Sequence, residues 1–170
     1  MPPDGPMNDE MDPLADLQGA EAFDALLARE ELRRARTGET LTVVVLDLDG
    51  LRGVNRRHGA AAGTEMLRYC ALSLRSSLRA VEELARTGPD DFSVLLHATD
   101  AAGAAGWTER FEDLLESSAA EHPAAPVTCS LGVADTGEAP TLMEAAARAR
   151  RRMEVVQTVR KLRRTRGSEL

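Results

Sequence analysis

The sequence lacks a long apolar run and has few cysteines. No stretch approaches the ~18 consecutive apolar residues that a membrane-spanning helix needs, so we expect a soluble, cytoplasmic protein that does not bind membranes. The two cysteines, Cys70 and Cys129, fit a reducing compartment. Neither has another Cys or a His at metal-site spacing, so both are interpreted as core residues.

A strong positive charge is also absent from the chain as a whole. The net charge of -7 and the pI near 5.1 argue against nonspecific nucleic-acid binding, because phosphates attract positive fields. Residues 144–170 hold nine basic side chains against three acidic ones, and the basic ones are mostly the arginines between Arg148 and Arg166. This segment is either a surface for an acidic protein partner or an ordinary solvated helix face.

The length of 170 residues and 43% hydrophobic content predict one globular domain. Residues 1–11 are acidic and rich in proline, without the basic and apolar regions of a signal peptide, and are predicted to be a disordered leader. The domain is expected over residues 12–160, followed by a basic C-terminal tail over residues 161–170.

The apolar pattern predicts alternating helices and strands. Helices are expected over residues 20–36, 61–79, around 107–115 and from Thr141 onward, where Glu144 completes a capping-box pattern. The helical stripes include Leu32, Leu78 and Leu114. Strands are expected over residues 41–48 (buried on both faces) and 127–134, with a hairpin over residues 83–98. This order predicts an α/β sandwich with one helix-covered sheet.

The hairpin contains the most informative stretch, Arg-Thr-Gly-Pro-Asp-Asp-Phe at residues 86–92. A Gly-Pro pair is a strong turn signal, so Asp90 and Asp91 are expected at the hairpin tip, where carboxylates can reach a metal or ligand. Asp is also common in turns that bind nothing, so an acidic turn without a ligand is the alternative.

Four motifs in one order resemble the GGDEF domain, the diguanylate cyclase family. They are residues 12–17, residues 46–55 with His58, Gly59 and Gly63, the signature at residues 88–92, and the late strand at residues 128–134. The resemblance covers about residues 12–160. It implies a nucleotidyl-cyclase-like α/β sandwich, with a central mixed sheet of about five strands covered by helices.

The family couples two GTP molecules into cyclic di-GMP, each held by one half of a homodimer. By resemblance, Asp47 and Asp90 would hold Mg²⁺ or Mn²⁺, for which carboxylate oxygens are suitable ligands. Asp90 would be the catalytic residue of the signature. Asn55 and Gly88 would bind the nucleotide.

The chain departs from the family pattern at several positions. Thr64 replaces a guanine-binding Asp, and a hydroxyl cannot receive two guanine N–H donors. Pro89 replaces the second signature glycine, which removes an N–H and adds a ring. Asp91 replaces a Glu and is one methylene shorter. Glu154 replaces a phosphate-binding Lys, a charge reversal for which residues 150–152, all arginines, offer a possible substitute.

The family's product-inhibition site also has a counterpart. Its Arg-x-x-Asp pattern is present as Arg79 and Glu82, with Arg86 nearby, and an arginine can grip a phosphate or stack on a guanine. The alternative is an ion pair at a helix end in solvent.

Three functions follow. The preferred one is a degenerate GGDEF protein of cyclic di-GMP signalling, a catalytically impaired regulatory module that binds GTP, cyclic di-GMP or a protein partner. The second is a weakly active diguanylate cyclase that works through Asp47 and Asp90. The third is a partner-binding domain that holds no nucleotide.

Overall fold

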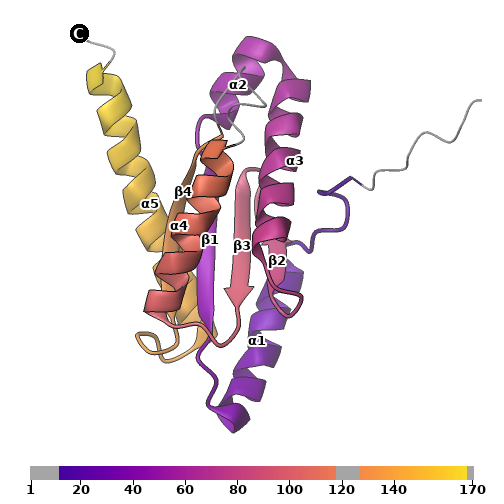
Figure 1. Cartoon of the computed structure of the whole chain (residues 1–170), viewed down its shortest axis with the longest axis vertical. Helices are drawn as coiled ribbons and strands as arrows, with labels where there is room; N and C mark the ends of the chain where they lie inside the picture. The colour runs from indigo at the N-terminus through magenta and orange to yellow at the C-terminus, as the bar shows by residue number, and fades with distance from the viewer. Residues whose placement is uncertain (1–11, 118–126, 168–170) are drawn as a thin grey trace, which may run out of the picture.

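The computed structural model describes residues 12–117 and 127–167, so the leader predicted over residues 1–11 lies outside the described residues. Helices and strands alternate along the chain (Figure 1). In order they are α1 (Ala20–Thr37), β1 (Thr42–Leu48), α2 (Leu51–His58), α3 (Ala60–Ser77), β2 (Glu83–Arg86), β3 (Asp91–Leu96), α4 (Ala101–Ser117), β4 (Cys129–Asp135) and α5 (Leu142–Gly167).

This order confirms the α/β class and every predicted helix and strand, to within a few residues at each end. The sequence did not predict α2. This short helix is separated from α3 by Gly59, whose φ of 89° is open to glycine but strained for other residues. At the start of α5 the backbone N–H of Glu144 donates to Thr141 Oγ1 at 3.2 Å, which confirms the predicted N-cap.

The sheet has the strand order β2-β3-β1-β4, and each of these neighbouring pairs is antiparallel. The described residues thus show four strands, where about five were expected. A parallel pairing occurs at the isolated bridge between Gln18 and Ala85. The segment before α1 therefore reaches the sheet edge at one residue and does not extend along it as a strand.

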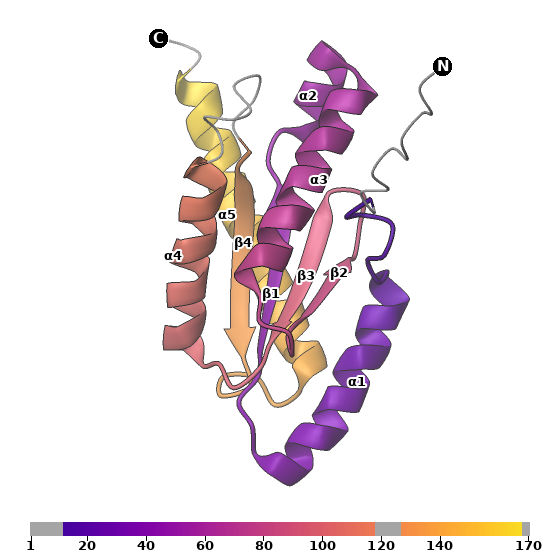
Figure 2. The ribbon, with the colours of Figure 1, turned by 45° about the vertical axis from the view of Figure 1, so that its right-hand side comes forward.

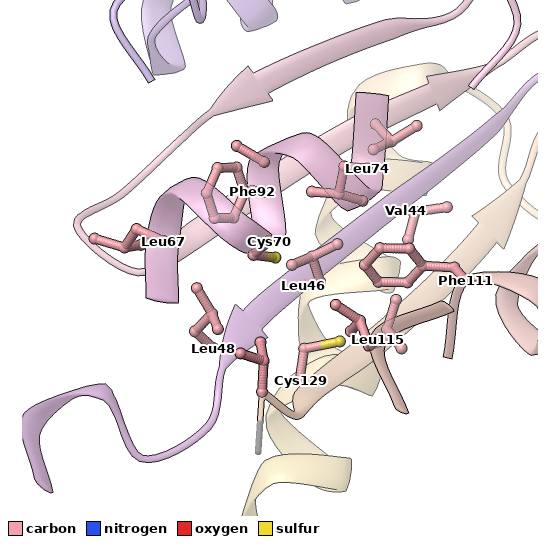
Figure 3. Packing of buried hydrophobic residues seen from close by; sticks show 14 of the residues in the cluster. Val44, Leu46, Leu48, Leu67, Cys70, Leu74, Phe92, Phe111, Leu115 and Cys129 are labelled. Carbon is pink, nitrogen blue, oxygen red and sulfur yellow. The ribbon is translucent and has the colours of Figure 1, made fainter. Parts of the chain in front are cut away.

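Helices cover both faces of the sheet. α3 and α4 lie in front of the sheet in Figure 2, and α5 passes behind it. The alternation of side chains along β1 divides the core, because Val44, Leu46 and Leu48 pack with residues of α2, α3 and α4. Figure 3 shows the contacts with α3 and α4. Val43 and Val45 pack with α1 and α5 on the opposite face. The prediction that this strand is buried on both faces is confirmed.

Two details of the helical predictions are wrong. Leu32 was expected in the apolar stripe of α1 but is 72% exposed, and Leu114 of α4 is also exposed. Leu32 lies five residues after Leu27, about 140° around the helix from it, and so faces solvent. α5 runs through residues 161–167 of the segment expected as the basic C-terminal tail.

α5 approaches β4 closely at Gly132. A Cβ added there would lie 1.8 Å from the carbonyl oxygen of Ala149 and 2.4 Å from the backbone nitrogen of Met153. Only a glycine permits this approach of backbone to backbone. The contact fixes the distance from α5 to the sheet, and therefore positions the side chains that α5 directs toward the end of β1.

None of the helices in the described residues combines the length and the apolar character that crossing a bilayer requires.

Candidate metal and nucleotide site

Three carboxylates meet where β1 ends beside the β2–β3 hairpin. Asp47 pairs with Asp91 across the β1–β3 ladder, and the Leu48 N–H donates to the carbonyl of Asp90 at 3.0 Å. One carboxylate oxygen from each of Asp47, Asp90 and Asp91 lies within 4.8 Å of the others. We call these three residues the carboxylate cluster. The structure brings together the two predicted metal ligands and adds Asp91.

The environment of the cluster raises the pKa of one of its carboxyl groups. The pKa of Asp47 is raised to about 7, first by burial, then by a hydrogen bond with Asp91 and by the charges of Asp90 and Asp91. Hard divalent cations such as Mg²⁺ and Mn²⁺ favour such a group of oxygen ligands, because the cation neutralises the repulsion among the carboxylates. The donor set therefore fits the implied metal.

Asp49, two residues after Asp47, has a different role. Its side chain is buried and accepts hydrogen bonds from Ser130 Oγ at 2.8 Å and Thr128 Oγ1 at 3.3 Å. Arg160 of α5 donates to it at 2.8 Å. This network joins the end of β1 to β4 and α5. Asp49 is thus fully engaged in holding the frame of the site.

α5 sends two side chains to the carboxylate cluster. Gln157 Nε2 donates to Asp47 Oδ1 at 2.7 Å, and Arg150 Nη1 lies 3.4 Å from Asp91 Oδ2. Positions 150 and 157 are seven residues apart, so they share one helix face. Arg152 instead pairs with Glu138. Of the three consecutive arginines, Arg150 is therefore the one that is bound to the cluster.

Gln157 is a site contact that sequence reasoning missed. The heptad spacing from Arg150 was a signal that could have indicated it. Glu154, expected at the position of the family's Lys, is exposed on α5.

The residues predicted to bind the base lie on α2 and α3. Asn55 covers Gly63, where an added Cβ would lie 1.7 Å from Asn55 Oδ1, so a side chain at position 63 would displace the Asn55 amide. The Thr64 hydroxyl donates to the carbonyl of Ala60 at 3.1 Å within its own helix. No hydrogen bond joins Asn55 to the carboxylate cluster within the described residues.

The signature turn is braced from within the hairpin. A Cβ at Gly88 would lie 2.7 Å from Asp91 Oδ2, so a side chain at this position would displace the Asp91 carboxylate. Arg86 Nη2 donates to the carbonyl of Pro89 at 2.6 Å. Arg86 thus supports the turn that carries Asp90.

A second site surrounds the predicted inhibitory residues. Arg79 Nε donates to Glu82 Oε1 at 2.9 Å, and the backbone N–H of Arg79 donates to Glu82 Oε2 at 2.7 Å. Both residues line a cavity of about 300 Å³, together with Trp107 and Arg110. Arg86 is not among its lining residues. The structure therefore groups two of the three predicted residues and contributes Trp107 and Arg110.

Residues 9–161 match the family described as "Diguanylate cyclase, GGDEF domain". The chain belongs to the GGDEF domain family. The resemblance inferred from four motifs and the fold class are confirmed.

Relatives of this GGDEF domain include diguanylate cyclase DgcP of Pseudomonas aeruginosa. The two are 34% identical over 124 residues, which make up 72% of this chain and 18% of DgcP. The chain thus corresponds to less than a fifth of that protein.

Two solved structures support the fold. Diguanylate cyclase SiaD of Pseudomonas aeruginosa, in complex with its activator SiaC, matches with a TM-score of 0.76 and 25% identity, over 87% of this chain and 58% of SiaD. A sensory box/GGDEF family protein from Caulobacter crescentus matches with a TM-score of 0.73 and 26% identity, over 86% and 96% of the two chains.

Proposed function

We propose that this chain is a catalytically impaired GGDEF domain that acts as a regulatory module in cyclic di-GMP signalling. GTP and a divalent cation would bind beside the carboxylate cluster. The observation that carries this proposal is the contact of α5 with that cluster. Asp47 and Asp90, the two expected metal ligands, lie together, but the Gln157 amide of α5 donates to Asp47. Glu154, three residues before Gln157, is exposed to solvent.

Asp47, Asp90 and Asp91 would hold Mg²⁺ or Mn²⁺. When bound, the cation neutralises charge on the phosphates and on the attacking hydroxyl. The protein's own contribution is to position these three side chains. β1 and β3 hold them through the Asp47–Asp91 pairing, and Arg86 braces the turn at Pro89.

Three features favour impaired turnover. Pro89 offers no N–H and places a ring at the signature turn. The Thr64 hydroxyl is already bound to its own helix, so it gives weak recognition of guanine. The Arg150 guanidinium forms an ion pair with Asp91, so its positive charge is only partly available to a triphosphate. Each loss weakens an interaction worth about 1.5–3 kcal/mol where a charged group is involved.

Calorimetry with GTP and Mn²⁺ tests binding, and chromatography of the products tests turnover. We expect Mn²⁺-dependent heat with the wild type and none with Asp90→Ala, because the variant loses a cluster ligand. The expected yield of cyclic di-GMP is less than one molecule per protein molecule. Asp113→Ala, an exposed carboxylate on α4, is the matched control and should bind like the wild type.

Two outcomes would contradict the proposal. Repeated turnover of GTP that disappears in Asp90→Ala would establish the weakly active cyclase. If neither GTP nor cyclic di-GMP gives heat, the remaining hypothesis is a domain that binds only protein partners.

Cyclic di-GMP binding at the Arg79 cavity is a second candidate function. The cavity contributes two arginines, Arg79 and Arg110, and Arg110 has no ion-pair partner among the described residues. Trp107 also lines the cavity, where its buried ring stacks on Phe111. Arginines can grip phosphates and stack on guanine, which suits a cyclic dinucleotide.

Alanine variants test this second function by calorimetry with cyclic di-GMP. Arg79→Ala and Arg110→Ala should each raise the Kd at least about tenfold, since each removes a charge-assisted contact worth about 1.5–3 kcal/mol. Arg86→Ala is the control, because Arg86 bonds to Pro89 outside the cavity. An equal loss in Arg86→Ala, or no heat with the wild type, would argue against the site.

A further inference from the structure

The C-terminal half of α5 exposes an apolar row on its outward side. Val155 is 64% exposed, Val159 is 42% exposed and Leu162 is 61% exposed. The row Arg151, Val155, Val159 and Arg163 follows i, i+4 spacing, with Leu162 beside it, so these five residues share one helix face. We call them the outer α5 face. Figure 1 shows this half of α5, in yellow, at the side of the molecule.

The fold itself does not use the outer α5 face. α5 packs on the sheet through Ala145, Ala149 and Met153, all of which are buried. Gln157 and Arg160 extend from that inward side to Asp47 and Asp49. Val155 and Leu162 lie on roughly the opposite side of the helix from these residues. Neither the packing of the fold nor the carboxylate cluster therefore accounts for apolar side chains at these positions.

The two charged residues of the outer α5 face, Arg151 and Arg163, are both positive. Arg151 and Arg163 have no ion-pair partner among the residues that the structure describes. Glu154 is the only acidic residue between Glu144 and Gly167. The face is thus a basic and apolar surface on a chain whose net charge is -7. Two copies placed face to face would oppose like charges, which disfavours a homodimer through this surface.

We propose that the outer α5 face docks an acidic amphipathic helix of a protein partner. Apolar side chains of the partner would cover Val155, Val159 and Leu162, and carboxylates beside them would pair with Arg151 and Arg163. Helix-on-helix recognition uses such i, i+4, i+7 anchors, and opposite charge at the margins sets the partner's identity. α5 has no aromatic residue, whereas helices that lie in membrane surfaces carry Trp or Phe on the apolar face.

The proposal deepens the regulatory function proposed above, because it identifies the chemistry of the partner. It concerns the side of α5 that faces away from the carboxylate cluster. A failed docking test would therefore leave the GTP result unchanged, and a failed GTP titration would leave this surface intact.

Fluorescence anisotropy with synthetic helical peptides tests the surface in the full chain. One labelled peptide carries a leucine stripe flanked by Glu, a second carries the same stripe flanked by Lys, and a third scrambles the Glu peptide. Only the Glu peptide is expected to bind, with affinity falling about tenfold from ~50 to ~300 mM NaCl as charge is screened. Its Kd should rise at least tenfold in Val155→Ser/Val159→Ser and in Arg151→Glu/Arg163→Glu.

The matched control is Leu72→Ser/Val81→Ser, which removes two comparably exposed apolar side chains elsewhere and should bind like the wild type. Circular dichroism checks that all variants keep their helix content. Equal binding of the scrambled peptide, or unchanged binding by Val155→Ser/Val159→Ser, would overturn the proposal. The proposal would also be overturned if sedimentation showed the wild type to be a dimer and Val155→Ser/Val159→Ser to be a monomer. Binding of the wild type to phosphatidylserine vesicles without binding to the Glu peptide would overturn it as well.

Discussion

Gly132→Ala is expected to lower the free energy of unfolding by about 3 kcal/mol or more, enough to unfold a marginally stable domain. The new methyl group would lie 1.8 Å from Ala149 O and 2.4 Å from Met153 N. Both are backbone atoms of α5, which cannot turn aside as a flexible side chain would. α5 would have to move away from β4, and the inward contacts of Gln157 and Arg160 would move with it. Urea unfolding followed by circular dichroism measures the change.

Gly106→Ala provides the matched control for this substitution. Gly106 lies within α4, and an added Cβ would meet only the end of the Arg110 side chain at 3.4 Å. The same Gly to Ala change should therefore raise stability by about 0.5–1 kcal/mol through helix propensity. If the free energy of unfolding of Gly132→Ala instead lies within about 1 kcal/mol of the wild-type value, α5 does not pack on β4 as closely as described.

Asp47→Asn is expected to stabilise the metal-free protein at pH 8 and to weaken its metal binding strongly. At this pH, above the pKa of about 7, the Asp47 carboxylate adds its charge to the cluster, and Asn removes that charge while keeping a polar group beside Gln157. Affinity for Mn²⁺ should fall about a hundredfold or more, because even residues outside the ligand shell change it by about 10- to 100-fold. Calorimetric titration with Mn²⁺ measures this loss.

The stability difference should depend on pH in a defined direction. The pKa of Asp47 is about 7 in the folded protein and 3.8 as its ordinary value, so between these values only the folded state keeps the proton. Stability from this proton is full below pH 3.8 and is lost as pH rises through 7. The free energy of unfolding of Asp47→Asn should therefore increase relative to that of the wild type as pH rises. We expect about 1 kcal/mol at pH 8, since water screens a half-exposed group.

Urea unfolding at pH 5 and pH 8 without divalent cations measures the difference. Asp24→Asn, an exposed carboxyl of α1, is the control and should show no such pH dependence. If Asp47→Asn is more stable than the wild type by the same amount at both pH values, the raised pKa of Asp47 is not the cause of the stability difference.

Much of the fold could be predicted from local pattern. The β-branched run in β1 and the helical stripes of α1, α3 and α4 carry their periodicity in the chain itself. The predicted count of strands was less accurate. Whether the segment before α1 pairs as a strand or touches the sheet at Gln18 alone depends on the shape of the sheet edge. The exposure of Leu32 likewise depends on which part of α1 the sheet covers.

The carboxylate cluster was predicted in part. Asp47 and Asp90 followed from their motifs, because strand-end and turn positions are recognisable in sequence. Gln157 and Arg150 were not assigned to the cluster. The periodicity of α5 shows which residues share a helix face, but it does not show which face packs against the carboxylate cluster. That choice follows from the contact of α5 with Gly132.

The amino-acid sequence by itself determined the family, the order of helices and strands, and the presence of carboxylates at the end of β1 and at the signature turn. These properties reside in residue types and short spacings, which do not need the chain to be folded. Only the tertiary structure decided that Asp91 joins Asp47, that Arg86 braces Pro89 while Arg110 joins Arg79 at its cavity, and that Val155 and Leu162 face solvent. Such contacts join segments far apart in the chain, and the direction of each side chain is set by the packing of helices on the sheet.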